Sequence, residues 1–145
     1  MNQDKAPVPS LPTPEVPARF QQFLAFDFGT KRTGVASGNR LMSQATPQAT
    51  IKAEGDARFA QIQARIKEWQ PDALVVGVPF HPDGAPHENT RLAQRFARQL
   101  RGRFNLPVYE VDERYSTTEA LAGGAKDADA ASACIILEQF LRQLP

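Results

Sequence analysis

Residues 23–36, FLAFDFGTKRTGVA, constrain the fold of this chain more than any other stretch. An apolar run carries one carboxylate, Asp27, in its middle, and Gly29 follows two residues later. Such a run is typical of a central strand covered on both faces, where an ionised carboxylate needs a partner, a shifted pKa or a metal ion. The cationic residues Lys31 and Arg32 come directly after the expected turn. The stretch therefore predicts a site for a charged ligand on a buried strand.

Turn signals indicate that the next strands run antiparallel to the first. Gly29 and Gly34 permit a tight reversal, and Gly38-Asn39 is a second turn signal. We therefore expect a strand over residues 33–37 and a further strand after the second turn, which together complete a three-stranded meander.

The remainder of the chain alternates helical and strand patterns. Apolar spacing predicts helices from about 55 to the proline at 71, over 90–104 and from 130 onward, and short apolar runs predict buried strands over 73–78 and 107–111. The helical side chains expected to face the core are Phe59, Ile62, Ile66, Trp69, Leu92, Phe96, Leu100, Ala133, Ile136, Leu137, Phe140 and Leu141. Short connections and right-handed crossovers then predict an α/β fold, a mixed sheet with an antiparallel meander plus parallel strands, flanked by helices.

Length and composition bound the organisation of the chain. A length of 145 residues suffices for one domain with one sizeable core, and a net charge of +1 means that any nucleic-acid binding relies on a local basic patch. Residues 1–19 contain five of the twelve prolines and few large apolar residues. We therefore expect a disordered proline-rich tail over 1–19 and a folded domain over 20–145.

The same composition bears on the compartment. Cys134 is the one cysteine, so no internal disulfide can form. No apolar run approaches the roughly 18 residues of a membrane span, and the N-terminus lacks the apolar core of a signal peptide. We expect a cytoplasmic protein with no membrane partner.

Carboxylates recur at three places that an open α/β sheet brings to one edge. Besides Asp27, Asp112 and Glu113 end the last strand, and Asp127 and Asp129 open the last helix. Strand ends and helix N-termini meet at one crevice, and oxygen ligands suit Mg²⁺ or Mn²⁺. Taken singly, Glu113 also fits a solvated strand end and Asp129 a helix cap. Together with nearby basic residues, the acids predict a phosphodiester substrate. Those basic residues are Lys31, Arg32 and Arg114.

A row of arginines follows the helix predicted over 90–104. Arg91, Arg95 and Arg98 recur at positions i, i+4 and i+7. The spacing fits a solvated helix face and equally a track for nucleic-acid phosphates, which guanidinium groups bind well.

Four motifs in this order resemble one known family. They are DFGTKRTGVA at 27–36, VVGVPFHPDG at 75–84, VDERYSTTEA at 111–120 and DAASACIILEQFL at 129–141. Together they resemble the YqgF family of RNase H-like proteins, which are related to Holliday-junction resolvases, and the resemblance covers residues 23–142.

The resemblance implies an RNase H-like nuclease that uses Mg²⁺ or Mn²⁺ to process the 5′ end of pre-16S ribosomal RNA, with ribosomal particles as a further partner. It implies Asp27, Glu113 and Asp129 as the metal-binding catalytic acids, with Asp127 as the alternative to Asp129. Two features depart from the family pattern: His81 replaces an asparagine of the G-x-P-x-N-x-D-G loop, and the segment between Glu119 and Asp129 is shorter.

Other functions stay open at this point. A resolvase of branched DNA would use the same acids, and a non-catalytic RNA-binding factor in ribosome assembly could keep the fold and its basic surface. Either a monomer or a homodimer fits the sequence. A nucleotide-binding ATPase of the actin and sugar-kinase type, which shares the Asp-x-Gly-Thr turn, needs two lobes and is excluded by the length of the chain.

Overall fold

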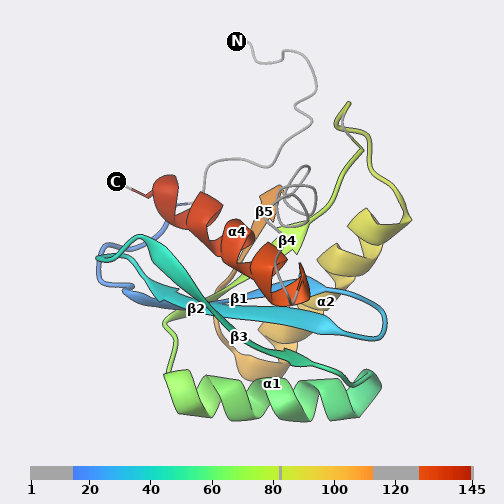
Figure 1. Cartoon of the computed structure of the whole chain (residues 1–145), viewed down its shortest axis with the longest axis horizontal. Helices are drawn as coiled ribbons and strands as arrows, with labels where there is room; N and C mark the ends of the chain where they lie inside the picture. Colours follow the sequence, from blue (N-terminus) through green and yellow to red (C-terminus); the bar gives the residue numbers. More distant parts are fainter. Residues whose placement is uncertain (1–14, 82, 113–127, 145) are drawn as a thin grey trace.

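The fold is seen in a computed structural model that describes residues 15–81, 83–112 and 128–144. In chain order the elements are β1 (Gln22–Phe28), β2 (Thr33–Asn39), β3 (Gln44–Ile51), α1 (Gly55–Trp69), β4 (Ala73–Val78), α2 (Glu88–Phe104), β5 (Val108–Asp112) and α4 (Ala128–Arg142). The strands form one sheet in the order β3-β2-β1-β4-β5. Helix α4 covers one face, and α1 and α2 cover the other (Figure 1).

The sheet has the mixed topology that the sequence predicts for an RNase H-like fold. β1 is the central strand and pairs antiparallel with β2 and parallel with β4. β3 continues the antiparallel half, and β5 continues the parallel half. The C-terminal ends of β1, β4 and β5 therefore meet at one edge of the sheet.

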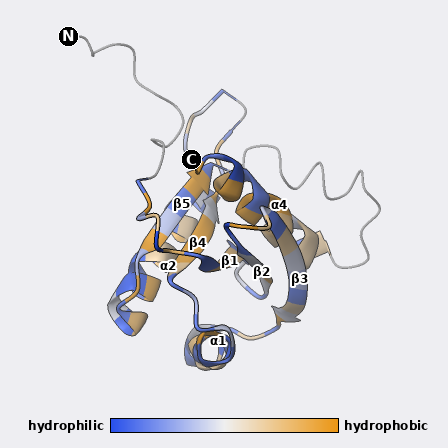
Figure 2. Ribbon diagram, turned by 90° about the vertical axis from the view of Figure 1, so that its left-hand side faces the viewer, coloured by the Kyte–Doolittle hydropathy of each residue, from blue (hydrophilic) through white to orange (hydrophobic). Residues whose placement is uncertain are grey.

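The apolar run of β1 is explained by its two covered faces. Leu24 and Phe26 lie in the core with α1 and α2, whereas Phe23 and Ala25 lie in the core with α4. Because side chains of a strand alternate between faces, a strand covered on both sides needs apolar residues at every position. The edge strand β3 shows the opposite pattern, with mostly hydrophilic colours in Figure 2.

Helices α1 and α2 are joined to β1 by one aromatic cluster. The ring of Phe96 in α2 lies 6.1 Å from Phe26, 4.8 Å from Phe28 and 5.9 Å from Phe59 of α1, measured between centroids. Phe96 lies at the centre of this core. The burial of Phe59 and Phe96 confirms that these residues face the core from α1 and α2, as predicted.

Most of the other predicted helix faces are confirmed, with one correction. All five residues predicted to point inward from the last helix are buried, and Ile66 and Trp69 pack at the margin of the core. In α2, however, Leu92 is only half-buried, and Ala93 and Ala97 join Phe96 in the core instead. The helix also starts at Glu88, two residues earlier than predicted.

A capping box explains the early start of α2. The His87 side chain accepts a hydrogen bond from the backbone N–H of Asn89, while the Thr90 hydroxyl accepts one from the backbone N–H of His87. These bonds satisfy N–H groups that the first helical turn leaves without partners.

The turn predicted at Gly38-Asn39 is wrong. Both residues belong to β2, where Gly38 pairs with Phe23 on one side and Ala45 on the other. The chain reverses after Asn39, whose side-chain oxygen accepts a hydrogen bond from Met42 N at 2.8 Å. Because the side chain of Asn39 stabilises the turn from its first position, Gly38 is not needed in the turn and stays paired in the strand.

Residues 15–19, which fall within the predicted tail, contact the domain. Val16 packs against the core beneath α4, and Arg40 donates hydrogen bonds to the carbonyls of Val16 and Pro17. The domain boundary at residue 20 stays a prediction. Within the described ranges, every helix is too short or too polar to cross a bilayer.

Helix α4 begins directly against β2. A Cβ atom added to Gly34 would lie 1.9 Å from the carbonyl oxygen of Asp129, in the first turn of α4. Only a residue without a side chain lets the helix start at this position.

The variant Gly34→Ala tests this contact. The added methyl group must push the helix away, so we expect the free energy of unfolding to fall by roughly 1–3 kcal/mol. Urea denaturation measures the change. The control is Gly102→Ala in α2, where no atom lies within 4 Å of the added Cβ, and where alanine should stabilise by about 0.5–1 kcal/mol. Equal stability of Gly34→Ala and the unmodified protein would contradict the contact.

Candidate active site

Asp27 lies on the α4 face of the sheet, near the edge where the parallel strands end. It is the penultimate residue of β1, and Ala25 and Phe23, two and four residues earlier, face α4. Asp27 is half-buried rather than fully buried, because β1 ends at Phe28 and not further along. The burial penalty on its carboxylate is therefore smaller than the apolar sequence around it suggests.

The neighbours of Asp27 on both adjacent strands are glycines. In β2 its partner is Gly34. In the parallel pairing of β1 with β4, Phe23 lies opposite Ala73 and Phe26 lies opposite Val76. Continued by one residue, this register places Gly77 opposite Asp27. Neither strand therefore places a Cβ atom directly beside Asp27, and the first turn of α4 fills the space at Gly34.

Asp129 reaches the same place from the other end of the chain. It lies in the first turn of α4, and its backbone lies against Gly34, the residue paired with Asp27. Its side chain is 33% exposed. Two of the three predicted catalytic acids are thus brought next to one glycine by the packing of α4 on β2.

Basic residues of the β1–β2 loop surround Asp129. Arg32 Nε lies 3.0 Å from Asp129 Oδ2. Gly29, Thr30, Lys31, Arg32 and Asp129 line an open hollow of about 550 Å³. Lys31 and Arg32 are exposed there, so the hollow offers positive charge beside Asp129.

Three predicted site residues, Glu113, Arg114 and Asp127, lie outside the described residues. The strand that precedes them, β5, ends at Asp112, and Val111 faces the α4 core and pairs with Gly77. Within the part of the chain that is described, no group of three or more His, Cys, Asp or Glu side chains is arranged to hold a metal ion. The described part of the site thus contributes two acids.

The loop after β4 is folded tightly at the edge where β1, β4 and β5 end. His81 N donates a hydrogen bond to the carbonyl of Ala85, and Gly84 N donates one to the carbonyl of His81. The rings of His81 and His87 lie 4.6 Å apart between centroids. His81, where the family pattern has asparagine, thus packs on the residue that caps α2.

The predicted arginine row of α2 is exposed, as a phosphate track requires. Arg91, Arg95 and Arg98 all reach solvent, and Arg91 forms an ion pair with Glu88 at 2.7 Å. The row begins in the first turn of α2. In Figure 1 the β1–β2 loop and the starts of α2 and α4 all lie towards the right-hand side of the view.

Arg58 is a site residue that the sequence did not indicate. It is only 5% exposed, and its Nη2 donates hydrogen bonds to the carbonyls of Gly29 at 2.8 Å and Thr30 at 2.6 Å. Desolvation lowers the pKa of its guanidinium, and the charge of Glu54 partly opposes that effect. An arginine in the first turn of a helix is ordinarily exposed, so no pattern pointed to its burial.

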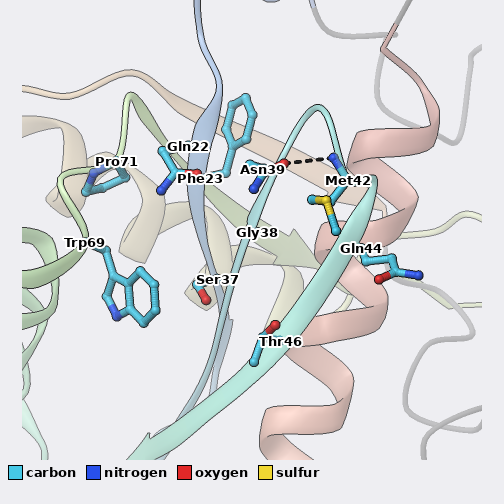
Figure 3. Close-up of a pocket in the computed structure, with 10 residues that line it drawn as sticks. All are labelled: Gln22, Phe23, Ser37, Gly38, Asn39, Met42, Gln44, Thr46, Trp69 and Pro71. Carbon is cyan, nitrogen blue, oxygen red and sulfur yellow. Dashed lines mark hydrogen bonds between the residues drawn. The ribbon is translucent and has the colours of Figure 1, made fainter.

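Two other features do not fit a catalytic centre. A hollow of about 210 Å³ lies between Gln22, Asn39 and Trp69, at the opposite end of β1 from Asp27, and none of the described residues that line it is a carboxylate (Figure 3). Burial, followed by the nearby charge of Glu138, raises the pKa of the Cys134 thiol to about 11. Cys134 therefore stays protonated near neutral pH and is a poor nucleophile.

Known structures match this chain at low sequence identity. RuvC from T. thermophilus, solved in complex with a Holliday junction substrate, matches with a TM-score of 0.49 and 18% identity over 85% of this chain and 95% of that chain. Pelota from Archaeoglobus fulgidus matches with a TM-score of 0.50 and 8% identity over 86% of this chain and 34% of that chain. At this level the likeness to Pelota concerns the fold alone.

Sequence relatives are much closer. A protein of Polaromonas sp. strain JS666 is 76% identical over 91% of this chain and 96% of its own length, and one of Albidiferax ferrireducens is 73% identical over 89% and 83%. Both carry the name "Putative pre-16S rRNA nuclease". The model of the RuvX family, described as Holliday junction resolvase, matches residues 21–143. The chain therefore belongs to the RuvX family, which is the YqgF family that its motifs resemble.

Proposed function

We propose that this protein is a metal-dependent endonuclease that hydrolyses a phosphodiester at the 5′ end of pre-16S ribosomal RNA. The observation that carries the proposal is the contact of Asp129 with Gly34, which brings one acid of α4 beside Asp27 of β1. The names of the relatives from Polaromonas and Albidiferax support the choice of substrate.

The described acids fit a hard divalent cation. Mg²⁺ is usually held in proteins by one or two carboxylates, with waters and substrate phosphates as the other ligands. Asp27 and Asp129 supply two carboxylates, and Gly34 lets the first turn of α4 approach the strand pair that carries Asp27. When bound, Mg²⁺ or Mn²⁺ polarises the phosphoryl group and lowers the pKa of a bound water.

We assign the third acidic role to Glu113, with Asp127 as the alternative to Asp129. This assignment rests on the VDERYSTTEA motif at 111–120.

The basic residues of the β1–β2 loop hold the substrate. Arg32 pairs with Asp129, which lowers the repulsion between the two acids, and an exposed pair of this kind contributes at most about 1 kcal/mol. A cation and a phosphate can therefore separate the pair, after which Arg32 and Lys31 neutralise the phosphate. Arg114, beside Glu113, is a further phosphate contact in this proposal.

The family description favours a second substrate, branched DNA. Cleavage assays on a precursor RNA and on a four-way DNA junction, each with Mg²⁺ and with Mn²⁺, separate the two. The absence of turnover on both substrates would favour a non-catalytic RNA-binding role in ribosome assembly.

Asp27→Asn tests the catalytic acid. The amide keeps the shape of the side chain and removes the charge that holds the cation, so we expect the cleavage rate to fall by at least about 10³-fold. The melting temperature should stay at or above that of the unmodified protein, because a half-buried charge is removed.

The matched control is Asp72→Asn. Asp72 accepts hydrogen bonds from the backbone N–H groups of Gln21 and Gln22, beside the N-terminal end of β1 and far from the site. This variant should cleave at the unmodified rate. Wild-type cleavage by Asp27→Asn would refute the assignment.

Replacement of Arg91, Arg95 and Arg98 by alanine tests the phosphate track. Nucleic-acid affinity should fall for every sequence, and the slope of log affinity against log salt should become shallower by roughly 0.7–0.9 per lost contact. The rate at saturating substrate should hardly change, because positioning charges bind ground and transition states alike. Arg95 and Arg98 should contribute more than Arg91, which Glu88 already neutralises.

Arg142→Ala, an exposed arginine in the last turn of α4, controls for the loss of one charge. An unchanged affinity and salt slope in the triple variant would show that the row is only a solvated helix face.

A further inference from the structure

Arg58 joins the start of α1 to the loop between β1 and β2. Besides its bonds to the carbonyls of Gly29 and Thr30, its Nε donates to the carbonyl of Ala53 at 3.1 Å. Its guanidinium carbon lies 4.5 Å from the centre of the Phe28 ring. The side chain thus contacts Gly29 and Thr30 of the loop, the last residue of β1, and Ala53 just before α1.

Burial of a guanidinium is unfavourable unless its N–H groups are bonded, and here backbone carbonyls accept those bonds. Arg65, on the same helix, shows the ordinary alternative. It is half-buried and donates one hydrogen bond to the carbonyl of Ala49 in β3, at 2.8 Å. A half-buried arginine with one such bond also links α1 to a strand, whereas the full burial of Arg58 brings its guanidinium to the β1–β2 loop.

The bonds of Arg58 fix the direction of two peptide groups. In a planar trans peptide the N–H points opposite to the C=O. Since the carbonyls of Gly29 and Thr30 point to Arg58, the N–H groups of Thr30 and Lys31 point away from it. Arg58 belongs to a helix on one face of the sheet, and Asp129 belongs to the helix on the other face.

The loop is also closed on itself. A Cβ atom on Gly29 would lie 2.7 Å from the carbonyl oxygen of Arg32, so the two ends of the loop are in contact. Thr30 and Lys31 lie outside β1 and β2, so their N–H groups take no part in the hydrogen-bond ladder of the sheet. Successive N–H groups in a tight turn form an anion-binding concavity.

We infer that Arg58 is a positioning residue that holds the β1–β2 loop as a phosphate-binding subsite. The N–H groups of Thr30 and Lys31, with the side chains of Lys31 and Arg32, bind one phosphate of the nucleic acid beside Asp129. The inference rests on the proposed function for the identity of its ligand. It adds a backbone contact to the phosphate and gives the buried arginine a role.

Amide NMR on ¹⁵N-labelled protein tests the subsite directly. A short single-stranded RNA and, separately, inorganic phosphate are titrated into the full chain in the presence of a chelator, so that no cleavage takes place. We expect the amide resonances of Thr30 and Lys31 to shift with both probes. No shift at either amide with either probe would overturn the subsite.

The two probes separate this inference from the proposed function. A phosphate response without RNA binding would retain the subsite and contradict a nucleic-acid substrate. An RNA that binds without moving these amides would overturn the subsite and leave the nuclease proposal standing.

Two variants test the role of Arg58. Arg58→Lys keeps the charge but lacks the fork that reaches several carbonyls, and Arg58→Met removes the charge at similar length. For both we expect the Thr30 and Lys31 shifts to be lost and the affinity for phosphate to fall about tenfold, as for the loss of one charge-assisted hydrogen bond.

Arg65→Lys and Arg65→Met are the controls, because they make the same substitutions at another arginine of α1 that donates a hydrogen bond to a carbonyl. They should leave affinity and both amides unchanged. All variants are compared at a temperature below their unfolding transitions. If Arg58→Met does not fold, the result for Arg58→Lys alone tests the role of Arg58. Wild-type affinity and amide shifts in the folded Arg58 variants would show that Arg58 only stabilises the fold.

Discussion

The site depends on how closely the first turn of α4 packs on β2. The carbonyl oxygen of Asp129 occupies the space where any residue other than glycine at position 34 would place a side chain. The same glycine is the strand partner of Asp27, so one contact between backbones decides the distance between two acids from opposite ends of the domain. The apolar face of α4 maintains this contact, because its buried residues fill the core above β1 and β2.

Charge around the site is balanced by residues on both faces of the sheet. On the α4 face, Arg32 pairs with Asp129 and moderates its repulsion with Asp27. On the opposite face, backbone carbonyls accept the hydrogen bonds of Arg58, so this arginine orients the loop without binding Asp27 or Asp129. The loop between the two arginines is thus held in place while its hollow remains open.

The sequence revealed the fold through its patterns of burial. The apolar run of β1, the short run of β4 and the stripe of α4 each reflect contact with a core, and the structure places all three as predicted. Asp27 was predicted for a related reason, since a carboxylate stands out in an apolar strand, whereas the choice of Asp129 over Asp127 came from the resemblance to the family.

Features that depend on three-dimensional proximity could not be found in this way. The burial of Arg58 follows from carbonyls that lie far from it in sequence, and the contact at Gly34 follows from the position of a helix nearly a hundred residues later. The early start of α2 depends on reciprocal bonds of His87 and Thr90, a variant of the usual capping pair that composition does not signal.

The central claim is that Asp27 and Asp129 together bind a divalent cation, and anomalous diffraction from crystals soaked in Mn²⁺ tests it most directly. The account predicts a single strong Mn²⁺ peak bonded to a carboxylate oxygen of each of the two acids, with Arg32 displaced from Asp129. A peak bonded to neither acid, or no peak at a Mn²⁺ concentration that supports cleavage, would contradict it.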